Sequence, residues 1–150
     1  MVVNGWHLFY FKLFAEILNQ LERDVLELSR SKPDEYLHHP KTKLLAAVAH
    51  SIGEDVPTNP ADRKFLLGKT LGKHYGDWRR VKRGLPPRYR LFFKFASAKK
   101  HIIYAWLNDE NTLRKEGDKN DVYAVFASML KNGTVPDGID QLMQQSSSRP

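Results

Sequence analysis

The sequence predicts an α+β domain in which helices pack on one face of a small, twisted antiparallel sheet. Three patterns lead to this prediction: a helical apolar period near the start, an alternating period in the middle, and a second helical period near the end. A chain of 150 residues can form one domain with a sizeable core. We assign residues 1–136 to a single domain and residues 137–150, which finish in QQSSSRP, to a flexible C-terminal tail.

Two helices are expected in the first third of the chain. The first covers residues 8–31 and ends before Pro33, because its apolar residues recur at helical spacing: Phe14, Ile17, Leu18, Leu21, Val25 and Leu28. The second carries Leu44, Leu45, Val48 and Ile52 and ends near Gly53. Together they resemble an α-hairpin whose apolar stripes need another layer to cover them.

The period changes to two after residue 64, which predicts strands. Residues 78–83 and 88–95 read as a hairpin joined by the turn Gly84-Leu85-Pro86-Pro87. Residues 101–107 form a nearly continuous apolar run, typical of a central strand buried on both faces. A further short strand is expected near residues 69–71.

A last helix is expected between the third strand and the tail. Asn120 or Asp121 can cap its N-terminus, and Asn132-Gly133 ends it. Between these signals the apolar residues follow a helical spacing: Val122, Val125, Phe126, Met129 and Leu130.

Composition excludes several classes of protein. The hydrophobic share of 41% and the charged share of 27% are ordinary for a soluble domain. No stretch approaches the roughly 18 to 20 apolar residues of a membrane span, and the apolar start lacks the basic leading region of a signal peptide. The chain has no cysteine, so disulfides and thiolate metal ligands are excluded. We therefore expect a cytoplasmic protein without a membrane partner.

Positive charge is concentrated in one segment. Residues 64–100 contain twelve Lys and Arg residues against the single acid Asp77, whereas the segments on either side are each near −2. Such a run is either a solvated face or a surface for a polyanion. Because it coincides with the predicted strands, it favours a phosphate-bearing partner.

Strand alternation divides the predicted hairpin into two faces. One face is apolar and is expected to meet the helices: Val81, Tyr89, Leu91, Phe93 and Phe95. The opposite face is expected to be open and carries cations beside two aromatic rings: Arg80, Lys82, Arg88 and Arg90, with Trp78 and Phe92. Cations hold phosphates and rings stack on splayed bases, so this face suits a flexible RNA strand. Alternation alone does not separate binding from cleavage.

Cleavage of RNA by its own 2′-hydroxyl group needs a base, an acid and fixed positive charge, and it needs no metal or cofactor. Neighbouring cations disfavour the protonated form of a lysine. Lys82, with Arg80 and Arg90 nearby in the predicted hairpin, is therefore the candidate base.

Six stretches, in order along roughly residues 3–133, resemble the YhaV family of bacterial toxins: VNGW, TKLLAAV, GKTLG, DWRRVKRG, RYRLFFKF and WLNDENTLR. These proteins are the toxin halves of type II toxin–antitoxin pairs within the wider RelE-like group. The resemblance does not extend past Pro136. It implies a RelE-like fold and an mRNA endonuclease that acts on ribosome-bound message. It also implies a PrlF-type antitoxin, an AbrB-like DNA-binding protein, through which the complex contacts operator DNA.

The resemblance also implies roles for individual residues. The group's catalytic cations fall on Arg80, Lys82, Arg90 and Arg114. The other cations and aromatic residues near them are expected to bind RNA: Trp78, Arg79, Arg83, Arg88, Phe92, Lys94 and Tyr123. A relative that poisons gyrase or only binds nucleic acid is the alternative, and the presence of Arg80, Lys82 and Arg90 counts against the gyrase-poisoning branch. An adaptor that meets an acidic protein partner is a third reading.

Overall fold

The computed structural model describes residues 1–149 and contains one mixed sheet with helices on both faces. The strand order is β1-β2-β5-β4-β3, and β6 pairs with β2 beside this path. The strand bounds are β1 (Val2–Val3), β2 (Trp6–Phe11), β3 (Arg79–Val81), β4 (Leu91–Ala96), β5 (His101–Leu107) and β6 (Ser146–Ser147). All pairs are antiparallel except β2 with β5, which is parallel.

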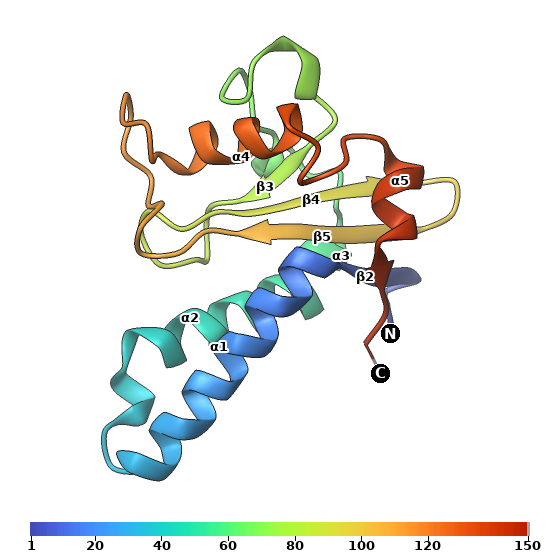
Figure 1. Cartoon of the computed structure of the whole chain (residues 1–150). Coiled ribbons are helices and arrows are strands. Elements are labelled where there is room, and N and C mark those ends of the chain that lie inside the picture. Colours follow the sequence, from blue (N-terminus) through green and yellow to red (C-terminus); the bar gives the residue numbers. More distant parts are fainter. Residues whose placement is uncertain (150) are drawn as a thin grey trace.

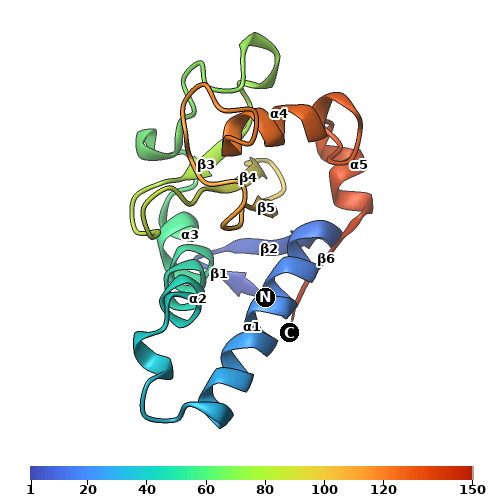
Figure 2. The ribbon, with the colours of Figure 1, turned by 60° about the vertical axis from the view of Figure 1, so that its left-hand side comes forward.

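The helices cover the two faces of this sheet unequally. Figures 1 and 2 show the long α1 and the neighbouring α2 on one side of the sheet, with α4 on the other side and α5 near β2. The helix bounds are α1 (Lys12–Ser31), α2 (Pro40–His50), α3 (Val56–Thr58), α4 (Val122–Lys131) and α5 (Ile139–Gln144). None of the helices within residues 1–149 is both long and apolar enough to cross a membrane.

Each face of the sheet has its own core. The α1/α2 face buries apolar residues of both helices against alternate strand residues, among them Phe14, Leu18, Leu44, Val48, Leu91, Phe93 and Tyr104. The α4/α5 face buries a second, aromatic-rich cluster, among them Trp78, Phe92, Ile103, Trp106, Phe126 and Leu142. Strand alternation sends Phe92 and Phe93 to opposite clusters, so both faces of β4 are buried.

The α+β class is confirmed, and three details of the predicted architecture are wrong. Residues 8–11 belong to strand β2 rather than to the first helix, which begins at Lys12. The sheet is not wholly antiparallel, because β2 runs parallel to β5. The helices do not share one face, because α4 covers the face that the sequence left open.

The middle of the chain also differs from prediction. The strand expected near residues 69–71 is absent, and these residues form a turn. The first arm of the hairpin is shorter than residues 78–83, since β3 comprises only Arg79–Val81. Residues 88–90 precede β4 instead of belonging to it. The hairpin itself is confirmed, with Val81 opposite Leu91.

Residues 137–149 do not form the flexible tail that the sequence predicted. They contain α5 and β6, and β6 pairs with the end of β2 through Ser146 and Phe11. Leu142 of α5 is fully buried in the second core. The fold therefore continues past residue 136 and ends in a strand that pairs with β2, near the start of the chain.

Candidate active site

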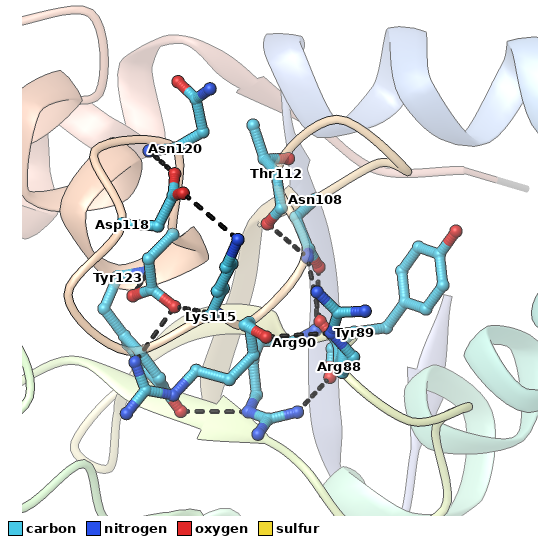
Figure 3. A network of polar contacts seen from close by, with 11 residues as sticks. Arg88, Tyr89, Arg90, Asn108, Thr112, Lys115, Asp118, Asn120 and Tyr123 are labelled. Carbon is cyan, nitrogen blue, oxygen red and sulfur yellow. Dashed lines mark hydrogen bonds and ion pairs between the residues drawn. The ribbon is translucent and has the colours of Figure 1, made fainter.

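Three arginines converge on one tyrosine at the end of the sheet that carries the β3–β4 turn. The guanidinium carbons of Arg80, Arg90 and Arg114 lie 5.7, 5.9 and 5.0 Å from the centre of the Tyr123 ring. The Nε atom of Arg90 also donates a hydrogen bond of 3.0 Å to the Tyr123 hydroxyl group (Figure 3). We call Arg80, Arg90, Arg114 and Tyr123 the arginine–tyrosine cluster.

Strand register accounts for two of these arginines. Arg80 of β3 lies opposite Phe92 of β4, which faces α4, so Arg80 is directed to the same side of the sheet. Arg90 precedes Phe92 by two residues and reaches that side as well. Both therefore meet the first turn of α4, where Tyr123 lies.

Asp121 holds Arg114 and Tyr123 in the cluster through hydrogen bonds. It is the N-cap of α4, one of the two capping residues that the sequence allowed, and its carboxylate accepts a bond of 3.1 Å from the Tyr123 backbone N–H. The same carboxylate accepts bonds from Arg114 Nη1 at 2.9 Å and from the Lys115 backbone N–H at 2.6 Å. One buried carboxylate thus fixes both the arginine and the helix turn that carries the tyrosine.

The electrostatics of the cluster differ between its arginines. Burial lowers the pKa of Arg80, and the positive charges of Arg90 and Arg114 lower it further, although Tyr123 acts in the opposite direction. The hydrogen bond to Asp121 raises the pKa of Arg114. Every guanidinium remains charged at neutral pH, so the cluster is a region of concentrated positive charge with one neutralising carboxylate.

The arginines retain donors for a ligand. Arg80 uses Nη1 to bond the Leu66 carbonyl oxygen at 2.9 Å, its Nε atom is buried, and its Nη2 atom, which makes no hydrogen bond within residues 1–149, is the donor left for a ligand. A guanidinium carries five N–H donors in a planar fork that matches phosphate oxygens. Beside Arg114 and Tyr123 the surface opens into a pocket whose other walls include Lys69 and the acidic Glu116 and Asp118. A group that enters this pocket from solvent reaches the Arg114 and Tyr123 side of the cluster.

The predicted open aromatic face is not there. Trp78 and Phe92 are fully buried, and Phe92 stacks on Phe126 of α4 with ring centres 4.1 Å apart. The indole N–H of Trp78 donates to a carboxylate oxygen of Asp137 at 2.9 Å. Neither ring has surface to offer a base, because α4 and the chain that follows it cover this side of the sheet.

Lys94 is also part of the interior. Its side chain is 8% exposed, and its ammonium group bonds to the Asp137 backbone carbonyl and lies 3.2 Å from a carboxylate oxygen of the same residue. The predicted RNA-binding role of Lys94 required an exposed charge. The structure instead places this charge between the sheet and the segment that leads into α5.

The remaining predicted cations lie either near the arginine–tyrosine cluster or on the opposite side of the sheet. Arg79 faces the opposite side of the sheet, with its guanidinium carbon 5.7 Å from the centre of the Phe95 ring. Arg88 is exposed, and its Nε atom donates to the Arg114 backbone carbonyl at 2.9 Å. Lys82 and Arg83 are exposed in the turn after β3. If the β3–β4 register continued by one residue, Lys82 would lie opposite Arg90.

Sequence reasoning missed one buried residue of the site and found only the capping role of another. Asp121 was read as a helix cap, and its bond to Arg114 depends on a loop that the pattern does not define. Asn108 was not singled out, although an amide directly after a buried apolar strand is a recognisable signal. Within residues 1–149, no three His, Asp or Glu side chains group as a metal site.

A family model described as a toxin with endonuclease activity, of a toxin–antitoxin system, matches residues 8–147. The chain belongs to this YhaV toxin family. It is 43% identical over 145 residues to the ribonuclease toxin YhaV of Escherichia coli strain K12 and, equally, to the toxin YhaV of Escherichia coli O6:H1. Each match covers 96% of this chain and 94% of the relative. No solved structure matches the chain at a significant level.

The family match reaches further toward the C-terminus than the stretches that resemble the family in sequence. The YhaV family match includes residues 137–147, which the resemblance left out and which form α5 and β6. The segment that covers Trp78 and holds Lys94 therefore belongs to the family domain. The family is one of endonuclease toxins that are paired with an antitoxin.

Proposed function

We propose that this chain is a ribonuclease toxin that cuts mRNA and so arrests translation and growth. The observation that carries the proposal is the convergence of three guanidinium groups on Tyr123, which together with Arg114 lines a pocket at the surface. The similarity to a relative named as a ribonuclease toxin supports RNA as the substrate. We place its action in the cytoplasm, where mRNA is translated.

The proposed reaction uses the 2′-hydroxyl group of the substrate. Its oxygen attacks the adjacent phosphorus, the bond from phosphorus to the 5′ oxygen breaks, and the products are a 2′,3′-cyclic phosphate and a free 5′-hydroxyl group. The guanidinium groups of Arg80, Arg90 and Arg114 stabilise the charge on the crowded phosphate. This reaction balances without a metal ion or a cofactor.

Two proton transfers accompany the attack: a base takes the proton of the 2′-hydroxyl group, and the leaving 5′ oxygen takes a proton from solvent water. Lys82 is the proposed acceptor of the 2′ proton, because it follows Arg80 in the chain and would face Arg90 if the strand register continued. The Tyr123 hydroxyl oxygen accepts the bond from Arg90, which leaves its own O–H free to donate to a phosphate oxygen. The exposed Arg83 and Arg88 would hold the backbone of the RNA on either side.

The partners follow from the same proposal. We propose that the message is cut on the ribosome, and that a PrlF-type antitoxin with an AbrB-like DNA-binding part keeps the enzyme inactive. Through that antitoxin the complex would contact operator DNA. An acidic segment of the antitoxin would find its charge complement in the exposed cations of residues 64–100.

The test uses purified protein and an RNA oligonucleotide in two arms: free RNA in buffer with EDTA, and RNA with ribosomes in buffer with Mg²⁺, with free RNA in that same Mg²⁺ buffer as its reference. We expect cleavage that leaves a cyclic phosphate and is lost when the nucleotide before the cut carries a 2′-O-methyl group. Cleavage of the methylated RNA would overturn the proposed mechanism. Tight binding without cleavage in either arm would favour the non-catalytic alternative, and cleavage of free RNA at the rate seen on ribosomes would overturn ribosome dependence.

A further inference from the structure

Asn108 follows strand β5 directly and is one of the few buried polar side chains, with 2% of its surface exposed. Its amide group makes three hydrogen bonds, all to backbone atoms. The oxygen accepts from the Arg90 N–H at 2.8 Å, and the nitrogen donates to the carbonyl oxygens of Arg88 at 3.1 Å and Thr112 at 2.9 Å. Figure 3 shows these bonds between the two chain segments.

These three bonds join the segments that supply two of the three arginines. Arg88 and Arg90 belong to the stretch that enters β4, and Thr112 belongs to the loop that leads from β5 to Arg114. Within residues 1–149, the other hydrogen bonds between these two stretches join Arg88 and Arg114. Asn108 thus connects the segment that contains Arg90 with the loop that leads to Arg114.

Arg88 and Arg114 strengthen this tie through a reciprocal pair. The Arg114 N–H donates to the Arg88 carbonyl oxygen at 3.0 Å, and Arg88 Nε donates back to the Arg114 carbonyl oxygen at 2.9 Å. The Arg88 backbone has a positive φ of 73°, which a residue with a side chain rarely adopts. Such a conformation persists only where surrounding bonds hold it, and the Arg88 carbonyl oxygen receives two of them, from Asn108 and Arg114.

We infer that Asn108 is a positioning residue that sets the separation of Arg90 and Arg114 around Tyr123. The inference rests on the proposed function, since it concerns how the same cluster is held for the reaction. Asn108 touches no substrate, because it is buried beneath the segments that it joins. Errors of about 1 Å in the position of catalytic groups reduce rates by around 100-fold. Loss of this side chain should therefore reduce the rate of the chemical step more than the affinity for RNA.

The test compares steady-state cleavage of an RNA oligonucleotide by wild-type protein, Asn108→Ala and Asn108→Asp. The Asp variant keeps the oxygen that accepts from Arg90 and loses the donor to Arg88 and Thr112. Tyr104→Phe is the matched control, because the Tyr104 hydroxyl group donates to the Ile52 carbonyl oxygen on the other face of the sheet. All assays are run well below the melting temperature of each variant.

We expect kcat to fall at least tenfold in both Asn108 variants while KM stays within about twofold, because the exposed cations that bind the RNA remain in place. Tyr104→Phe should keep both constants even if its melting temperature falls. Wild-type kcat in either folded Asn108 variant, or a change confined to KM, would overturn the inference. If Asn108→Ala does not fold, Asn108→Asp decides the question.

A second readout does not depend on cleavage. The Arg90 Nε–H group, which donates to Tyr123 and is buried, should give a slowly exchanging NMR signal in the wild-type protein. That signal should exchange faster in the Asn108 variants and stay unchanged in Tyr104→Phe. If the wild-type protein cuts no RNA, the proposed function fails, and this signal still tests whether Asn108 holds Arg90. An unchanged signal in both Asn108 variants would overturn the positioning role.

Discussion

Arg90 and Lys94 lie on the same side of the sheet, and each residue is 7% exposed. Their bonding partners differ. Arg90 bonds to the hydroxyl group of Tyr123 beside an open pocket. Lys94 bonds to Asp137 beneath the chain that leads into α5. The partner of a buried cation, rather than its place in the strand, therefore decides whether it can meet a ligand.

Phe92→Ala tests whether the second face of β4 is core. Because Phe92 is fully buried against Phe126 and Trp106, truncation should lower the free energy of unfolding by about 3 to 5 kcal/mol. Urea unfolding followed by circular dichroism measures this change. A variant as stable as the wild type, with weaker RNA binding, would mean that Phe92 is an exposed stacking residue after all.

Asp121 should make stability depend on pH. Burial alone raises the pKa of Asp121, but hydrogen bonds from Arg114 and from the backbone N–H groups of Lys115 and Tyr123 outweigh it and leave the pKa below its usual value. The ionised side chain therefore stabilises the fold above the ordinary value of about 3.9, and this contribution is lost as the pH falls through the lower folded value.

The wild type should accordingly exceed Asp121→Asn in unfolding free energy by a constant amount above about pH 5, and the gap should shrink below about pH 4. Urea unfolding of both proteins from pH 3 to pH 7 measures it. Two curves that stay parallel through the acidic range would show that the Asp121 carboxylate is not held in its ionised form by the fold.

At the scale of elements, the short segment α5 completes the domain. It packs Leu142 into the second core, and the chain around it supplies the partner of Trp78 and Lys94. Leu142→Ala should therefore lower the free energy of unfolding by about 2 to 5 kcal/mol, as for a buried leucine. Met143→Ala, whose side chain is only partly buried, is the control and should cost less. Equal stability of Leu142→Ala and wild type would restore the prediction of a flexible tail.

Local patterns predicted most helices and two of the three longer strands, but not the elements that depend on distant partners. The helical period from Phe14 onward identifies α1, and the alternation around Leu91 identifies β4. Strand β2, with the sequence WHLFYF, has apolar residues on both faces, and its pattern fits a helix equally well. Its parallel pairing with β5, some 90 residues away, leaves no local signal.

The candidate site was predictable to a similar extent. The charge of residues 64–100 and the order of its motifs identified Arg80 and Arg90, and the family resemblance added Arg114 and Tyr123. Their convergence is a property of the fold. The burial of Trp78, Phe92 and Lys94 follows from α4 and α5 covering the second face, which alternation within a strand cannot reveal.

At the scale of the whole molecule, positive charge is concentrated in one segment, where some cations are buried and others are exposed. Residues 64–100 carry a net charge of +11, while the segments before and after them are each near −2. Part of this charge holds the fold together, as in Lys94, and part gathers around Tyr123 or lies exposed in the β3–β4 turn. The pocket that adjoins the cluster takes its own positive charge from Lys69 and Arg114.

Single-turnover cleavage by Arg90→Ala tests most directly whether the arginine–tyrosine cluster is where RNA is cut. Removing one donor that stabilises charge in a transition state costs roughly 100- to 1,000-fold in rate. We expect a loss of this size in Arg90→Ala protein that is folded by circular dichroism. Folded Arg90→Ala protein that cuts the same RNA at the wild-type rate would contradict the assignment of the cluster.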